Sequence, residues 1–194
     1  LHNDTLKEIF KSSKNLNFAI LSPVSDNKEF LNYKIFSKRE QNQKDLIEVD
    51  RVDGYAMILD KLKFDNNFFD EKFFLYLEND DLCLRMKNKK ENIYICVKSL
   101  ISHLGGKAVS DKFFKEIELS RNWHWSWSRL YFRKKHYGLI NAIFSCLPNF
   151  MKSLFKCLVY FFTNKFKFKV NYLRLSGFYH ALINNKSWYR PKFD

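Results

Sequence analysis

Short apolar runs that alternate with helical patterns limit the folds open to this chain. FAILSP (18–23), VDRVDGYAMIL (49–59) and NIYICVKSLI (92–101) have the length and aliphatic content of strands. NDTLKEIFKSS (3–13) and LYLENDDLCLRMKNKK (75–90) have apolar residues at helical spacing. Strands that alternate with helices predict a layered α/β fold.

Proline and glycine refine the expected strands. Pro23 is expected to end the first strand, and the polar residues 24–47 after it are expected to form a loop. Gly54 lies inside the second strand, where a glycine indicates a bulge or the close approach of another chain or a ligand.

Length and a change of pattern at Gly138 define the expected domain organisation. A chain of 194 residues predicts one globular domain. Helical spacing runs over 113–138, and Gly138 is expected to end that helix. We therefore separate a main part, 1–138, from a basic, aromatic-rich helical extension, 139–194.

The apolar tract at 139–162 resembles a membrane-spanning helix only at first sight. Pro148, Lys152 and Lys156 interrupt it, whereas a spanning helix needs about 20 uninterrupted apolar residues. The pattern favours a partly buried or interfacial helix. Its mixture of lysines with Phe, Leu and Ile is typical of segments that lie on an anionic membrane surface, and a helical subdomain packed on the sheet is the alternative.

Positive charge is concentrated near the C-terminus. The net charge is +13, yet residues 1–110 carry 18 Lys and Arg against 17 Asp and Glu, while residues 111–194 carry 16 against 4. This asymmetry indicates contact with an anionic partner, such as ligand phosphates, a membrane surface or nucleic acid. A solvated basic face is the alternative.

The four cysteines have no metal-binding spacing. Cys83 and Cys96 lie in apolar runs and are predicted to be reduced core residues. No signal-peptide pattern opens the sequence. These features predict a cytoplasmic protein.

Three acids cluster between the apolar runs of FFLYLENDDLCLRM (73–86). Glu78, Asp80 and Asp81 lie near an expected helix start. Crowded carboxylates raise one another's pKa, which makes one of them a better proton acceptor at neutral pH. The alternative is that acids favour the positive end of a helix dipole.

These acids belong to a longer motif. FDEKFFLYLENDDLCLR (69–85) resembles the segment F-D-E-x-F-F-x-Y-x-E-D-x-D-L-C-x-R of family 2 glycosyltransferases, especially the rhamnosyltransferase-like branch. Four more segments resemble elements of that branch in the same order: VDGYAMIL (52–59), ISHLGGKAVS (101–110), RNWHWSWSRLYFRKKHYG (121–138) and RLSGFYHALINNKSWYRP (174–191).

The resemblance implies a partial glycosyltransferase A-type fold that lacks the N-terminal nucleotide-binding half and ends in a helical extension. It implies inverting transfer from a nucleotide-diphosphate sugar, usually with Mg²⁺ or Mn²⁺, to a saccharide or lipid-linked acceptor in cell-surface polysaccharide synthesis. The chain would be the later part of the enzyme, with the metal-binding D-x-D motif expected ahead of it. The enzyme would be cytoplasmic, or peripheral on the inner face of the plasma membrane.

The resemblance also implies catalytic roles for Glu78, Asp80 and Asp81. Asn79 stands where the family has its usual base, and an amide cannot accept the acceptor's proton. Glu78 or Asp80 therefore takes that role, or activity is weakened, and Asp81 is expected to orient the site. Arg85, four residues after Asp81, is expected to pair with it.

Further site residues follow from the same resemblance. His103 is assigned to the metal and diphosphate end, Asp53 and Gly54 to a substrate pocket, and Trp125 to the floor of the acceptor site. Tyr131 and Lys135 are assigned to the donor diphosphate. Each has a structural alternative: a lone structural histidine, a strand bulge, core packing of the tryptophans, or a solvated helix end.

Two other functions stay open. One is a non-catalytic basic module that binds membrane or RNA through cationic and aromatic side chains. No RNA-binding signature occurs, so nucleic acid is not the expected partner. The other is a degenerate transferase relic, since Asn79 replaces an acid and the donor half is not matched.

Overall fold

The computed structural model describes residues 2–36, 45–103 and 110–193. Contacts divide the chain into two compact units, where its length predicted one domain. The first unit comprises Leu1–Asp70 and Glu78–Gly105, and the second comprises Glu71–Leu77 and Gly106–Asp194. Gly138 lies inside the second unit, so the compact units divide at a different place from the expected boundary at residue 138.

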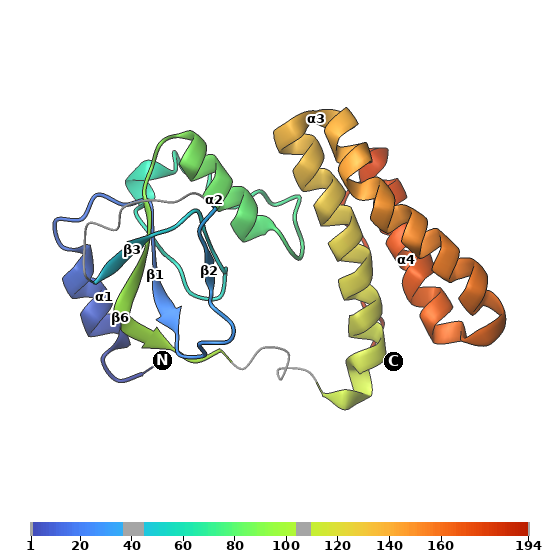
Figure 1. The fold of residues 1–194 in the computed structure, drawn as a ribbon, viewed down its shortest axis with the longest axis horizontal. Helices are drawn as coiled ribbons and strands as arrows, with labels where there is room; N and C mark the ends of the chain where they lie inside the picture. Colours follow the sequence, from blue (N-terminus) through green and yellow to red (C-terminus); the bar gives the residue numbers. More distant parts are fainter. Residues whose placement is uncertain (1, 37–44, 104–109, 194) are drawn as a thin grey trace. The chain divides into compact units, whose positions relative to one another are not determined.

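The first unit is a small mixed α/β layer (Figure 1). Its elements are α1 (Thr5–Ser13), β1 (Ile20–Ser25), β2 (Tyr33–Lys34), β3 (Leu46–Glu48), β4 (Arg51–Val52), β5 (Ile58–Leu59), η1 (Lys61–Lys63), α2 (Glu78–Asn88) and β6 (Ile93–Ile101). The main sheet has the order β3-β6-β1-β5, with β1 and β6 parallel and both edge strands antiparallel. Strands β2 and β4 form a separate antiparallel pair. The predicted α/β class is confirmed.

Three details of the sheet differ from the sequence expectations. Pro23 does not end β1, because the strand continues to Ser25 with a register shift just after the proline. Such irregularities accept a residue that cannot donate a ladder hydrogen bond. The expected loop at 24–47 contains β2 and the start of β3, and the expected strand at 49–59 is split into β4 and β5 by a turn.

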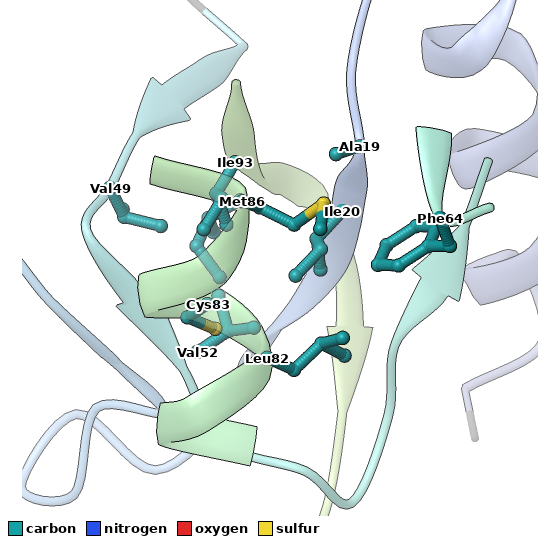
Figure 2. Close-up of a cluster of buried hydrophobic side chains, with 10 residues drawn as sticks. Ala19, Ile20, Val49, Val52, Phe64, Leu82, Cys83, Met86 and Ile93 are labelled. Atoms are coloured by element: carbon teal, nitrogen blue, oxygen red, sulfur yellow. The ribbon is translucent and has the colours of Figure 1, made fainter. Parts of the chain in front are cut away.

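The core of the first unit lies between α2 and the sheet. Figure 2 shows Leu82, Cys83 and Met86 of α2 among buried aliphatic side chains of the strands, including Ile20 and Ile93. The three α2 residues are spaced i, i+1 and i+4, so they share one helix face. Packing of this face fixes α2, and with it the acids at the helix start. All four cysteines are free and buried, which agrees with the prediction for Cys83 and Cys96.

The second unit is helical. It contains η2 (Asp111–Phe113), α3 (Phe114–Thr163) and α4 (Lys165–Leu182). Gly138 has φ 84° and ψ 165° and divides α3 into two segments, so the predicted helix end is confirmed. The second segment runs back beside the first and beside α4 (Figure 1). Pro148 lies within this second segment.

Aromatic side chains form the core of the second unit. Trp123 and Trp127 are buried, and they pack with Leu130 of α3 and Leu173 of α4. Gly177 of α4 lies so close to α3 that an added Cβ would overlap the carbonyl oxygen of Trp123. The helices therefore touch backbone to backbone at this glycine.

One described helix, α3, is long and apolar enough to cross a membrane by length and composition. Its most apolar window has a mean hydropathy of 1.3 and is 22% buried in the structure. Most of that apolar surface is therefore uncovered, unlike the surface of a core helix.

Candidate active site

An arginine and two acids meet where β4 leads toward α2. Arg51 of β4 places its Nε 2.6 Å from Asp80 Oδ1, and its terminal nitrogen 3.7 Å from Asp53 Oδ1. The shorter contact is an ion pair by distance, without the alignment of a hydrogen bond at Nε. Asp80 is 8% exposed. One cation thus holds two carboxylates that are far apart in the sequence.

Burial raises the pKa of the Asp80 carboxyl. The positive charge of Arg51 opposes this change, while the negative charges of Asp53 and Glu78 add to it. A carboxylate whose pKa is raised toward neutrality holds a proton better than an ordinary aspartate. Burial therefore favours the protonated form of Asp80, and the pairing with Arg51 favours its carboxylate.

Glu78, the first residue of α2, has a buried oxygen that lacks a partner. Its Oε2 makes no hydrogen bond with any of the described residues. Buried carboxylate oxygens are normally satisfied, so an unsatisfied one indicates a site for another hydrogen-bonding group. The preceding residues, Tyr76 and Leu77, have φ of 70° and 67°. A positive φ is strained for residues other than glycine, and such strain is concentrated at functional sites.

Asn79 has a structural role that an acid could not fill. Its Nδ2 donates a hydrogen bond to the carbonyl oxygen of Val52 at 2.8 Å. Gly54 lies against the same side chain, since an added Cβ would come within 3.2 Å of the Asn79 Cβ. The close approach indicated by Gly54 is therefore made by Asn79 of this chain. The amide ties the start of α2 to the end of β4.

Asp81 is fully buried and pairs with Arg85 Nε at 2.9 Å. The terminal nitrogens of Arg85 donate to the carbonyl oxygens of Asn67, at 2.8 Å, and Phe68. The expected i, i+4 pair is present. It fastens the loop before α2 to the helix, and the orienting role of Asp81 in catalysis stays a prediction.

His103 is exposed and stacks face to face on Tyr55, with ring centroids 4.2 Å apart and planes at 7°. Burial raises the pKa of the Tyr55 hydroxyl, against a hydrogen bond to Ser25 that lowers it. The glycine pair expected after His103, residues 105–106, lies outside the described residues. Stacking thus gives His103 a definite contact in the first unit.

The described residues do not gather enough ligands for a divalent cation. Within residues 2–36, 45–103 and 110–193, no group of three or more His, Cys, Asp and Glu side chains is arranged to hold a metal ion. His103 is therefore a single candidate ligand. The described residues alone do not fit a metal site.

The remaining predicted residues, Trp125, Tyr131 and Lys135, belong to the second unit. Trp125 is 44% exposed, whereas Trp123 and Trp127, which share a helix face at i and i+4, are buried. Tyr131 stacks on Trp127 with centroids 4.9 Å apart and meets Phe73 edge to face. It is thus part of the aromatic core.

Lys135 lies on the same helix as Tyr131 and is exposed, with its Nζ 5.9 Å from the centre of the Phe73 ring. The structure brings Glu78, Asp80, Asp53 and Gly54 together in the first unit. It places Trp125, Tyr131 and Lys135 in the other unit, which is described by itself.

Sequence reasoning missed two residues of the first unit. Arg51 was not singled out, although a basic residue two positions before Asp53 on a strand lies on the same face as that acid. Tyr55 was missed because its contact is with His103, far away in the sequence. No local pattern could have indicated that pairing.

The chain matches no family model, no curated protein and no solved structure.

Proposed function

We propose that this chain supplies the catalytic acids and the acceptor side of an inverting glycosyltransferase of the A-type fold. The enzyme would move a sugar from a nucleotide-diphosphate sugar to a saccharide or lipid-linked acceptor during synthesis of a cell-surface polysaccharide. One observation carries the proposal: Asp80, nearly buried and with a raised pKa, lies beside a Glu78 oxygen that lacks a partner. The motif at 69–85 supports it.

In the proposed reaction, the acceptor hydroxyl donates a hydrogen bond to Asp80. Its oxygen attacks the anomeric carbon, the bond from that carbon to the diphosphate breaks, and the hydroxyl proton passes to the Asp80 carboxylate. Arg51 holds this carboxylate in place. Glu78 Oε2 accepts a second hydroxyl of the acceptor, which fixes the angle of attack. Donor binding and the Mg²⁺ or Mn²⁺ ion stay predictions that concern the donor half.

Substitution in the complete protein, expressed from the full coding sequence of its source, tests these roles. A panel of uridine, guanosine and thymidine diphosphate sugars serves as donors, and release of nucleoside diphosphate is measured together with sugar incorporation. We expect Asp80→Asn to lower kcat about a hundredfold or more, because it removes the base. Glu78→Gln is expected to lower kcat/KM about tenfold by weakening one charged hydrogen bond.

Glu91→Gln is the matched control, because Glu91 lies just beyond the other end of α2 and pairs with Lys63 at 3.0 Å. It should leave the rate within about twofold. Unchanged transfer by the double variant of Glu78 and Asp80 would show that the acids are not catalytic. A complete protein without transfer on any donor would favour the binding-module or relic interpretation.

We also propose that the second unit binds the inner face of the plasma membrane. Six side chains of α3 after Gly138 are 51–87% exposed: Ile140, Phe144, Met151, Phe155, Leu158 and Phe162. Their spacings of 4, 7, 4, 3 and 4 residues place them on one helix face. At 1.5 Å per residue this apolar face is about 33 Å long. Nearby lysines complement anionic lipid headgroups.

Sedimentation with vesicles tests this binding. The complete protein should sediment with vesicles of phosphatidylcholine and phosphatidylglycerol. Phe144→Ser with Phe155→Ser should weaken vesicle binding about tenfold or more, because two rings that enter the bilayer are lost. Leu62→Ser with Phe36→Ser removes equally exposed apolar side chains of the first unit and should have little effect. Equal losses in both double variants would contradict the assignment of α3.

A further inference from the structure

A pocket of about 200 Å³ lies among the helical segments of the second unit. The first segment of α3 contributes Trp125 and Arg129, the second contributes Lys152 and Lys156, and α4 contributes Arg174. Residues spaced i and i+4 lie on the same face of a helix, so each α3 segment turns two of these side chains to the pocket. Figure 1 shows these segments running side by side.

The pocket gathers positive charge without negative charge. Four of its lining residues are cations, and none of its lining residues is an acid. None of the four cations forms an ion pair with a carboxylate in the described part of the chain. Like charges held close together repel one another, and the repulsion is relieved only when an anion binds among them. The charge of this pocket therefore favours an anionic ligand.

One of the cations, Arg174, is held in place by a neutral side chain. Arg174 Nε donates to Asn122 Oδ1 at 2.7 Å, and the amide of Asn122 in turn donates to Glu118 Oε1 at 2.6 Å. Burial raises the pKa of the Cys146 thiol, and the positive charge of Arg129 lowers it, so Arg129 lies close to this thiol. A guanidinium that is oriented through Nε keeps its terminal nitrogens for a planar or tetrahedral oxyanion. Phosphate oxygens suit this arrangement.

A ring wall accompanies the cations. Trp125 is 44% exposed and is met edge to face by Tyr76 at 5.4 Å, which fixes its orientation. Phe150 and Phe178 add apolar surface to the same pocket. An exposed indole beside charged groups suits a ligand that is part apolar ring and part anion. The volume is below the roughly 300–1,000 Å³ of pockets for drug-sized ligands, so a small headgroup fits.

We propose that this pocket binds the phosphate ester of a polyhydroxylated ring, with the phosphate among Arg129, Lys152, Lys156 and Arg174 and the ring against Trp125. The ester comes either from a soluble sugar phosphate or from the headgroup of a lipid. The site lies wholly in the second unit and does not depend on catalysis by the acids of α2.

Calorimetric titration of the complete protein near physiological salt tests the proposal. The soluble probes are inorganic pyrophosphate and glucose 1-phosphate. The membrane probe is a phosphatidylcholine vesicle that contains phosphatidylinositol 4-phosphate, compared with a phosphatidylserine vesicle of equal charge. Binding of glucose 1-phosphate identifies a soluble source. Binding of the phosphoinositide vesicle alone, above the phosphatidylserine vesicle, identifies a lipid source.

Paired charge removals show whether the pocket is responsible. Lys152→Gln with Lys156→Gln should weaken binding of whichever probe binds the wild-type protein about tenfold or more, because two charged hydrogen bonds are lost. Lys165→Gln with Lys186→Gln removes the same charge from the same unit outside the pocket lining and should change binding less than about twofold. Circular dichroism confirms that both variants are folded.

The indole has its own test. Trp125→Ala should weaken the binding of glucose 1-phosphate, or of the phosphoinositide vesicle, because these ligands carry a ring that contacts the indole. The binding of pyrophosphate, which has no ring, should stay unchanged. The proposal is overturned if no probe binds the wild-type protein, or if the two lysine pairs weaken binding equally. Equal weakening of ring and ringless probes by Trp125→Ala overturns the ring contact.

Discussion

The two units handle charge in opposite ways. In the first unit two of the three acids at the start of α2 are paired inside the unit: Asp80 with Arg51 and Asp81 with Arg85. In the second unit the cations of the pocket between α3 and α4 form no ion pair among the described residues. Paired charges hold a local geometry, whereas a group of unpaired positive charges attracts an anion from outside the unit. The first unit therefore balances most charges of its candidate site internally, whereas the pocket of the second unit keeps an excess of positive charge.

The units also differ in how closely their elements approach. In the first unit Gly54 meets a side chain, with an added Cβ 3.2 Å from the Asn79 Cβ. In the second unit Gly177 meets the backbone of Trp123 itself. A side chain can move by a few tenths of an ångström, but a helix backbone moves only with its whole helix. The second unit should therefore tolerate an added methyl group far less well.

Alanine at each of these glycines gives the largest expected effect. We expect Gly177→Ala to lower the free energy of unfolding of the second unit by about 3 kcal/mol or more, since α4 must separate from α3. Gly54→Ala should cost the first unit about 1 kcal/mol. Urea unfolding followed by tryptophan fluorescence reports the second unit alone, because all four tryptophans lie there, and circular dichroism reports both. Equal costs at the two positions would contradict the difference in packing.

Acid should destabilise the second unit through His124. Its Nε2–H donates to the carbonyl oxygen of Tyr189 at 2.7 Å, so Nδ1 accepts from the Ser187 hydroxyl at 2.9 Å. Burial lowers the pKa of His124 to about 4, and the charge of Arg190 adds to this, while the bond to Tyr189 opposes it. The unfolded chain binds a proton below its ordinary pKa of 6.5, but the folded unit does not until about pH 4.

The free energy of unfolding should therefore fall as the pH falls from about 6.5 to 4, by at most about 3 kcal/mol from this one group. Tryptophan fluorescence in urea, at a series of pH values, measures the slope. His124→Gln keeps one donor and one acceptor and cannot titrate, so the slope should largely vanish. A slope that survives in this variant would assign the acid sensitivity to other groups.

Periodicity predicted the elements that pack on an apolar face. The helix at 3–13, the α2 acids at a helix start, and the break at Gly138 follow from local spacing and backbone preference, and all are present. The separation of exposed Trp125 from buried Trp123 and Trp127 follows from helical geometry alone. Short edge strands such as β2 and β3 escaped prediction, because two or three residues carry no period.

The sequence indicated the acids of the candidate site but not the residues that pair with them. Glu78 and Asp80 stand out because they are crowded in the sequence, whereas Arg51 meets Asp80 only after β4 packs beside α2. The pocket cations were visible as surplus charge, but Arg129, Lys152 and Arg174 come from three helical segments. Their meeting depends on tertiary packing, which no local pattern contains. Asn79 was interpreted as a lost acid, and the structure gives it a contact of its own.

A further expected effect concerns that asparagine and the hydrogen bond that ties the start of α2 to β4. Asn79→Asp removes the donor to the Val52 carbonyl oxygen and sets two acceptors against each other, so the first unit should lose about 1–3 kcal/mol of stability. Asn88→Asp, at the exposed end of the same helix, should cost less than about 0.5 kcal/mol. Labelling of the buried Cys83 thiol, whose pKa burial raises to about 12, reports opening of this unit. If Asn79→Asp instead left the unit stable and increased sugar transfer, the amide would be a replacement for the base and not a structural tie.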